Sequence, residues 1–407
     1  MGLTNILAMD GGNGIVTADL LQKLEDVNHN RYLNRADLFV GTSAGGINSL
    51  FLASQDNPTD ALQHILEFWT NVNRSILGGL SAAEVEERAK AAVEANAVLP
   101  VATQAGQDVI GAIFHSILGL GEAAFGFRSL FRNDVLKQCL TQYFGADTVL
   151  GDLRKKVIIV SFQLDNGKTG IKQSWAPKLF TNLDYGSSGQ PRAPGEAQGS
   201  DMHEKIVDVA LRTSAAPLEL PIYQGMDGTG PGYVDGGLVA NNPAMIALSA
   251  ILGTLRRAAG AKAKLDLDDA LSEINLLSVG TGRNLVGTAQ FLDPEFSGGS
   301  AAWGYKQWLF DPSNLVVLID AWIQGGNIAV SKQCELLMGD ENFHRLNVPL
   351  QFMMAEKSPA TDAVVAEAAA WLQTKNWFKQ QPKLAITAQV PMLHAGKRAQ
   401  FPATPGA

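Results

Sequence analysis

Short apolar runs alternate with longer amphipathic stretches over the first part of the chain, a pattern typical of alternating strands and helices. Residues 5–9 form an apolar run that we interpret as a buried strand, and residues 36–40 form a second one. Between them, leucines and a valine recur at helical spacing over residues 20–27. This order predicts a βαβ unit with parallel strands and a right-handed crossover.

The same kinds of pattern continue downstream and predict an α/β protein. Asn242 followed by Pro243 is typical of a helix start. We expect further strands at residues 155–162, 175–180, 232–235 and 274–279, and further helices at residues 206–215 and 360–379.

A glycine-rich turn follows each of the first two predicted strands. The first turn, residues 10–14, reads Asp-Gly-Gly-Asn-Gly, and the second, residues 41–45, reads Gly-Thr-Ser-Ala-Gly. Both turns lie at the carboxyl ends of parallel strands, where open α/β sheets bind their ligands.

The second turn has the pattern of a nucleophile elbow. Gly41 and Gly45 flank Ser43, a strand precedes them, and a helix-like run follows at residues 46–53. Small residues are needed there because the backbone is strained and crowded. The alternative is a serine in an ordinary strand-to-helix turn.

A serine needs a base, and Asp235 is the best-placed candidate. It ends an apolar strand and precedes Gly236 and Gly237, which let another backbone approach closely. The alternative is a turn aspartate that binds its own backbone. We interpret the histidines as structural, because none has a catalytic setting; they are His29, His64, His115, His203, His344 and His394.

The first turn is a candidate oxyanion hole. The backbone N–H groups of Gly11, Gly12 and Asn13 are expected to converge on an anion at the start of a helix. Phosphate binding is the rival use of such a turn. However, Thr17 stands where a dinucleotide-binding motif has its third glycine, and the lysine of a P-loop is missing.

Together, these three sites resemble the patatin-like phospholipase family. That family carries an Asp-Gly-Gly-Gly-x-Arg-Gly loop, a Gly-x-Ser-x-Gly elbow and a later Asp-Gly-Gly or Asp-Gly-Ala, and it uses a Ser–Asp dyad without histidine. The resemblance implies that Ser43 is the nucleophile and Asp235 the dyad aspartate. It extends from about residue 3 to residue 345 and includes further similar segments at residues 213–217, 239–243 and 278–282.

The first turn departs from the family pattern at three positions. Asn13 replaces the third glycine, Ile15 replaces the arginine and Val16 replaces the last glycine. Oxyanion donors of this kind are backbone groups, so they tolerate an asparagine whose φ is permitted. The departures therefore concern efficiency and substrate preference more than reaction type.

The resemblance implies a three-layer α/β/α sandwich with a mostly parallel central sheet, and a lipid acyl hydrolase that works through an acyl-serine without metal or cofactor. Phospholipids or other acyl esters would be its substrates. We expect a hydrolase domain at residues 1–345, with a helical insertion at about 71–127, and a C-terminal helix and tail at 346–407. Two alternatives stay open: an acyltransferase that uses the same dyad, and a regulatory or binding protein with a degenerate site.

Composition narrows these expectations. Hydrophobic residues make up 46% of the 407-residue chain, enough for a large core, and the net charge of −8 argues against nucleic-acid binding. With two cysteines and no visible signal peptide or membrane-spanning run, we expect a cytoplasmic protein. Peripheral membrane contact stays open, because an apolar run at residues 109–120 fits either a core helix or a lipid-facing flap.

Overall fold

The computed structural model describes residues 4–29, 31–76, 133–165, 175–183, 201–217, 220–225, 228, 230–259, 265–282, 317–349 and 359–378. The predicted insertion, apart from residues 71–76, lies outside this part of the chain, as do the run at 109–120, His115 and His394. Among the described residues, none of the helices combines the length and apolar character needed to span a bilayer.

A central sheet organises the fold. Its strands are β1 (Thr4–Met9), β2 (Leu38–Thr42), β3 (Lys156–Gln163), β4 (Ala176–Thr181), β5 (Tyr233–Asp235), β6 (Ile274–Val279) and β7 (Phe343–Leu346). They lie in the order β4-β3-β2-β1-β6-β7, with β5 paired to β3. The strands β1, β2, β3, β6 and β7 run parallel, whereas β4 and β5 run antiparallel to β3. The mostly parallel sheet predicted from the sequence is therefore confirmed.

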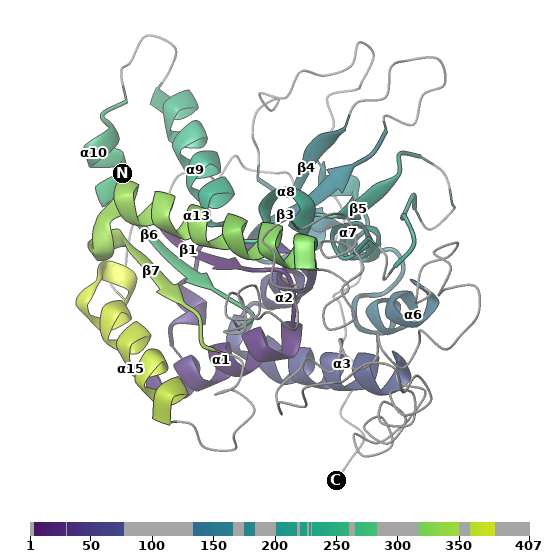
Figure 1. Ribbon diagram of the computed structural model, residues 1–407, viewed down its shortest axis with the longest axis horizontal. Coiled ribbons are helices and arrows are strands. Elements are labelled where there is room, and N and C mark those ends of the chain that lie inside the picture. Colours follow the sequence, from purple (N-terminus) through teal and green to yellow (C-terminus); the bar gives the residue numbers. More distant parts are fainter. Residues whose placement is uncertain are drawn as a thin grey trace, which may run out of the picture.

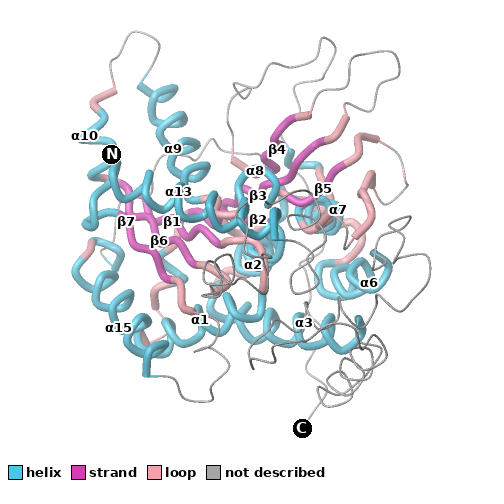
Figure 2. The backbone as a smooth tube through the Cα atoms, in the orientation of Figure 1, coloured by secondary structure: helices cyan, strands magenta, loops and turns pink. Residues whose placement is uncertain are grey.

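Helices cover both faces of this sheet (Figure 1), and Figure 2 shows the strands gathered at the centre. One face carries α1 (Gly14–Val27), α2 (Ser43–Ser54), α3 (Ala61–Ile76), α6 (Asn133–Phe144), α7 (Ile206–Thr213) and α15 (Pro359–Thr374). The other face carries α9 (Ala244–Ala259), α10 (Leu267–Ser272) and α13 (Val317–Asn342). The short α8 (Gly237–Ala240) follows β5. This is the expected three-layer α/β/α sandwich.

Successive side chains of a strand point to opposite faces of the sheet, and here both sets are apolar, so helices must cover both faces. In β1, Leu7 and Met9 belong to the core beneath α1 and α2, while Ile6 and Ala8 belong to the core beneath α9 and α13. A strand buried on both sides has no polar face, so its sequence is a continuous apolar run. Burying each large aliphatic side chain contributes about 1.5–3 kcal/mol to the stability of the folded state.

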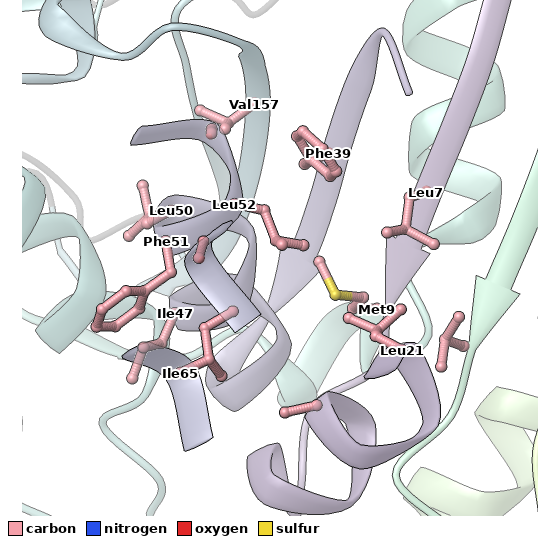
Figure 3. Packing of buried hydrophobic residues seen from close by; sticks show 14 of the residues in the cluster. Leu7, Met9, Leu21, Phe39, Ile47, Leu50, Phe51, Leu52, Ile65 and Val157 are labelled. Atoms are coloured by element: carbon pink, nitrogen blue, oxygen red, sulfur yellow. The ribbon is translucent and has the colours of Figure 1, made fainter. Parts of the chain in front are cut away.

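The helix α2, which follows the elbow, lies deep in the larger of the two cores, the one that contains Leu7 and Met9 of β1. Figure 3 shows its side chains among those of β1, β2, β3, α1 and α3, with Leu7, Met9, Leu21, Phe39, Ile47, Leu50, Phe51, Leu52, Ile65 and Val157 labelled. Residues 44–53 are all buried, so α2 cannot move without disturbing the core. This packing fixes the position of the helix that begins at Ser43.

The C-terminal helix α15 belongs to the same larger core. Trp371 and Leu372 pack in it, and the following segment is tied to the first strand through Trp377. The Trp377 indole N–H donates to the Tyr32 carbonyl over 2.9 Å, and the Asn5 side-chain amide donates to the Trp377 carbonyl over 3.0 Å.

Candidate active site

The elbow forms where β2 passes directly into α2. Ser43 is the first residue of α2 and has φ of 54°, a left-handed conformation that few non-glycine residues adopt. A Cβ atom added to Gly45 would lie 2.4 Å from the Met9 carbonyl oxygen, so only glycine lets α2 approach the end of β1. An added Cβ on Gly41 would likewise meet the Gly45 backbone. These contacts hold the elbow and the first glycine turn side by side.

The short strand β5 brings Asp235 to the elbow. On β3, Val160 pairs with Thr42 of β2, and the next residue, Ser161, pairs with Asp235 of β5. Because β4 pairs along the opposite edge of β3, β2 and β5 share the same edge and meet end to end. Ser43, directly after Thr42, therefore lies beside Asp235.

The two side chains are in contact. The Ser43 hydroxyl donates a hydrogen bond to the Asp235 carboxylate, and the Gly237 N–H donates to Asp235 Oδ1 over 2.6 Å. Asp235 is only 6% exposed. Burial raises the pKa of Asp235 to about 6, although the hydrogen bonds from Ser43 and Gly237 act to lower it. A carboxylate with this pKa is ionised at neutral pH and basic enough to accept a hydroxyl proton.

The first glycine turn lies at the start of α1, next to the elbow. Gly12 has φ of +125°, and a Cβ added there would lie 2.6 Å from the Thr281 hydroxyl oxygen. Asn13 is the N-cap residue of α1 and has φ of −82°, so asparagine meets no strain where the family carries glycine. Its position at a helix N-terminus suits anion binding.

Gly11 differs from its predicted use. Its N–H donates to the Asn241 carbonyl over 3.1 Å, so in this conformation it does not face an oxyanion. The Gly11 carbonyl accepts from the Thr281 hydroxyl over 3.1 Å and from the Asn241 side-chain amide over 3.3 Å. The sequence could not show this, because Asn241 and Thr281 lie far along the chain. Gly11 therefore anchors the turn, and Gly12 and Asn13 are the candidate donors.

Ile15 departs from the family pattern, whereas Asp10 matches it. Ile15, which stands where the family has arginine, packs against the larger apolar core. Asp10 is buried and forms an ion pair with Arg345, a residue of β7. Sequence reasoning did not single out Arg345. A single arginine within a four-residue strand has no motif around it that could have pointed to this pairing.

His344, on the same strand, has a structural setting. Its ring stacks on Trp371 with centroids 5.5 Å apart and an interplanar angle of 24°. Burial lowers the pKa of His344, which keeps the ring neutral over a wider pH range. His64 lies against Tyr143, with ring centroids 6.4 Å apart.

The comparison with known proteins decides the family. The model of the patatin-like phospholipase family matches residues 7–248. The chain belongs to this family. The matched region contains Ser43, Asp235 and the first glycine turn, so the resemblance stated from the motifs is confirmed.

Patatin-like relatives with curated descriptions come from bacteria and plants. The putative sporulation hydrolase CotR of Bacillus subtilis is 28% identical over 69% of this chain. A cGAMP-activated phospholipase of Pseudomonas aeruginosa is 27% identical over 60% of it, and patatin-like protein 4 of Arabidopsis thaliana is 22% identical over 76%. The aligned regions span 64%, 55% and 66% of those proteins, respectively. Membership supports lipid acyl hydrolysis as the class of activity.

Proposed function

We propose that the chain hydrolyses carboxylic esters of lipids through a Ser43–Asp235 dyad and an acyl-serine intermediate. The observation that carries this proposal is the hydrogen bond from the Ser43 hydroxyl to a buried carboxylate whose pKa lies near 6, at a strained elbow. Glycerophospholipids, lysophospholipids or other acyl esters are the proposed substrates, in keeping with the patatin-like family.

In the first half of the reaction, Ser43 Oγ attacks the ester carbonyl while Asp235 accepts the hydroxyl proton. The negative charge on the tetrahedral oxygen is stabilised by the N–H groups of Gly12, Asn13 and Ala44, and by the positive end of α2. When the tetrahedral intermediate collapses, the bond to the leaving alcohol breaks and Asp235 returns the proton to that alcohol.

In the second half, Asp235 takes a proton from water, and the resulting hydroxide adds to the acyl carbonyl. Collapse of this second intermediate releases the fatty acid, and the proton returns to Ser43 Oγ. Both halves use the same base and the same donors, so neither half needs a histidine.

Mass spectrometry of products from a mixed phospholipid substrate tests the proposal. We expect free fatty acid with the wild-type protein, and a loss of about 10³-fold or more with Ser43→Ala or Asp235→Asn. Ser54→Ala is a matched control, because Ser54 lies at the far end of α2 and donates only to the Phe51 carbonyl. A wild-type protein without activity, or one whose activity survives Ser43→Ala, would refute the dyad.

A fluorophosphonate probe supplies a second readout that needs no knowledge of the substrate. An activated serine reacts with this probe, whereas a serine in an inert turn does not. We expect labelling of the wild-type protein at Ser43, confirmed by peptide mapping, and none of Ser43→Ala.

A further inference from the structure

Arg345 reaches the first glycine turn from two strands away. The strand register places Ala8 of β1, Ser278 of β6 and Arg345 of β7 in one row across the sheet. Asp10 comes two residues after Ala8, so both side chains point to the same face, the one covered by α9 and α13. The small side chains of Ala8 and Ser278 leave room for the arginine to extend along this row.

Both terminal nitrogens of the Arg345 guanidinium group bind Asp10. Arg345 Nη1 donates to Asp10 Oδ1 over 2.8 Å, and Nη2 donates to Oδ2. Nη1 also donates to the Ser278 hydroxyl over 2.7 Å. Asp10 is 1% exposed, and the Arg345 side chain is 14% exposed. A planar guanidinium that binds both carboxylate oxygens fixes the orientation of its partner as well as its distance.

Asp10 connects the two parts of the candidate site. Its N–H donates to the Val279 carbonyl over 3.0 Å, and its own carbonyl oxygen lies against the elbow, 2.5 Å from a Cβ added to Gly45. The next residues are Gly11 and Gly12. Any rotation of the Asp10 peptide would therefore displace the turn relative to the elbow.

A buried ion pair adds little net stability, because the cost of desolvating both charges offsets most of their attraction. The geometry of the pair, in contrast, restricts both the orientation and the position of the Asp10 carboxylate. Asp10 neutralises the charge of Arg345, so Arg345 is unsuited to stabilising an oxyanion directly. Its effect must pass through the position of Asp10.

We infer that Arg345 is a positioning residue for the proposed hydrolysis: by binding both carboxylate oxygens of Asp10, it holds the turn that carries the Gly12 and Asn13 donors in register with Ser43. This inference rests on the proposed function. The positioning arginine then comes from β7, because the first turn carries the apolar Ile15 where the family has arginine.

Steady-state kinetics on a soluble short-chain ester test the role of Arg345. For Arg345→Gln we expect kcat to fall about 100-fold while KM stays within about threefold, because the displaced donors act in the transition state. Asp10→Asn/Arg345→Gln removes both charges and lets two amides pair, so it should recover about tenfold of that loss. Arg154→Gln is the matched control, because Arg154 pairs with Asp56 at the surface and should change kcat less than twofold.

The outcomes separate this inference from the proposed function. A wild-type protein without Ser43-dependent activity would overturn both. An active wild-type protein whose kcat survives Arg345→Gln, or falls only with the folded fraction measured by circular dichroism, would overturn the inference alone. A double variant no more active than Arg345→Gln would also overturn it.

Arg345→Lys keeps the test decisive if Arg345→Gln fails to fold. Lysine retains the charge but offers a single ammonium in place of the two-point contact, so we expect kcat to fall about tenfold with KM unchanged. A kcat equal to that of the wild type would refute the positioning role.

Discussion

The Ser43 N–H donates a hydrogen bond to the Thr213 hydroxyl oxygen over 2.9 Å, which ties the elbow to the end of α7. The Thr213 hydroxyl in turn donates to the Val160 carbonyl on β3. Ser43 is held at a positive φ, and such strain persists only where the surroundings restrain the backbone. Thr213 is one of these restraints.

Replacing Thr213 by valine should therefore lower activity without creating a cavity in the core. Valine matches threonine in shape but cannot accept the Ser43 N–H, so we expect kcat on a soluble ester to fall about tenfold. Thr213→Ser keeps the hydroxyl and should retain most of the activity. If Thr213→Val and Thr213→Ser have equal kcat values, the hydrogen bond does not matter for catalysis.

The pH dependence of hydrolysis should report Asp235. Only the ionised carboxylate accepts the Ser43 proton, and burial raises its pKa to about 6. We expect kcat to rise tenfold per pH unit below about pH 6 and to level off above it. A pH–rate profile between pH 4 and 9 checks this, and an inflection near pH 4 would contradict a buried base.

The same carboxylate should make the folded state less stable at neutral pH. Its pKa is about 6 in the folded protein against 3.8 for the unperturbed group, so its favourable contribution is complete below pH 3.8 and is lost as the pH rises through 6. Asp235→Asn should therefore raise the free energy of unfolding at pH 8 by roughly 1–3 kcal/mol. Urea denaturation at pH 8 and pH 4 measures this difference, which should shrink at the lower pH. A less stable Asp235→Asn at pH 8 would contradict the prediction.

Gly12→Ala should impair catalysis through the shape of the first turn. The added methyl group meets the Thr281 hydroxyl, and φ of +125° is unfavourable for alanine, so we expect kcat to fall by about 100-fold. Gly339→Ala is a matched control, because Gly339 has φ of +67° but nothing within 4 Å of the added Cβ. It should lower the melting temperature and leave kcat unchanged. A Gly12→Ala protein that melts early but keeps its kcat would limit Gly12 to a folding role.

His344→Ala should affect stability and leave catalysis intact. The imidazole stacks on Trp371, so its removal should cost roughly 1–2 kcal/mol of unfolding free energy. We expect kcat to stay within about threefold of the wild-type value. A loss as large as that of Ser43→Ala would instead require a triad with histidine.

The elements with strong local signals were predictable from the sequence. The strand at residues 274–279 was predicted with its observed bounds, and the helix start after Asn242 is confirmed by the hydrogen bond from the Ala244 N–H to the Asn242 side chain over 3.1 Å. The second strand was placed two residues early, at 36–40 instead of Leu38–Thr42, because the apolar run does not mark where pairing begins. The helix α13 and the short strand β7 were not predicted.

The sequence by itself determined the chemistry that the candidate site can offer, because the elbow, the glycine turn and the aspartate each carry their signal within a few residues. Only the tertiary structure decided which groups meet. Asp235 reaches Ser43 because β2 and β5 share one edge of β3, Gly11 is bound by Asn241, and Arg345 crosses β6 to Asp10. These pairings depend on strand order and register, which are set by the packing of the whole sheet. They cannot be recognised from the sequence around each residue.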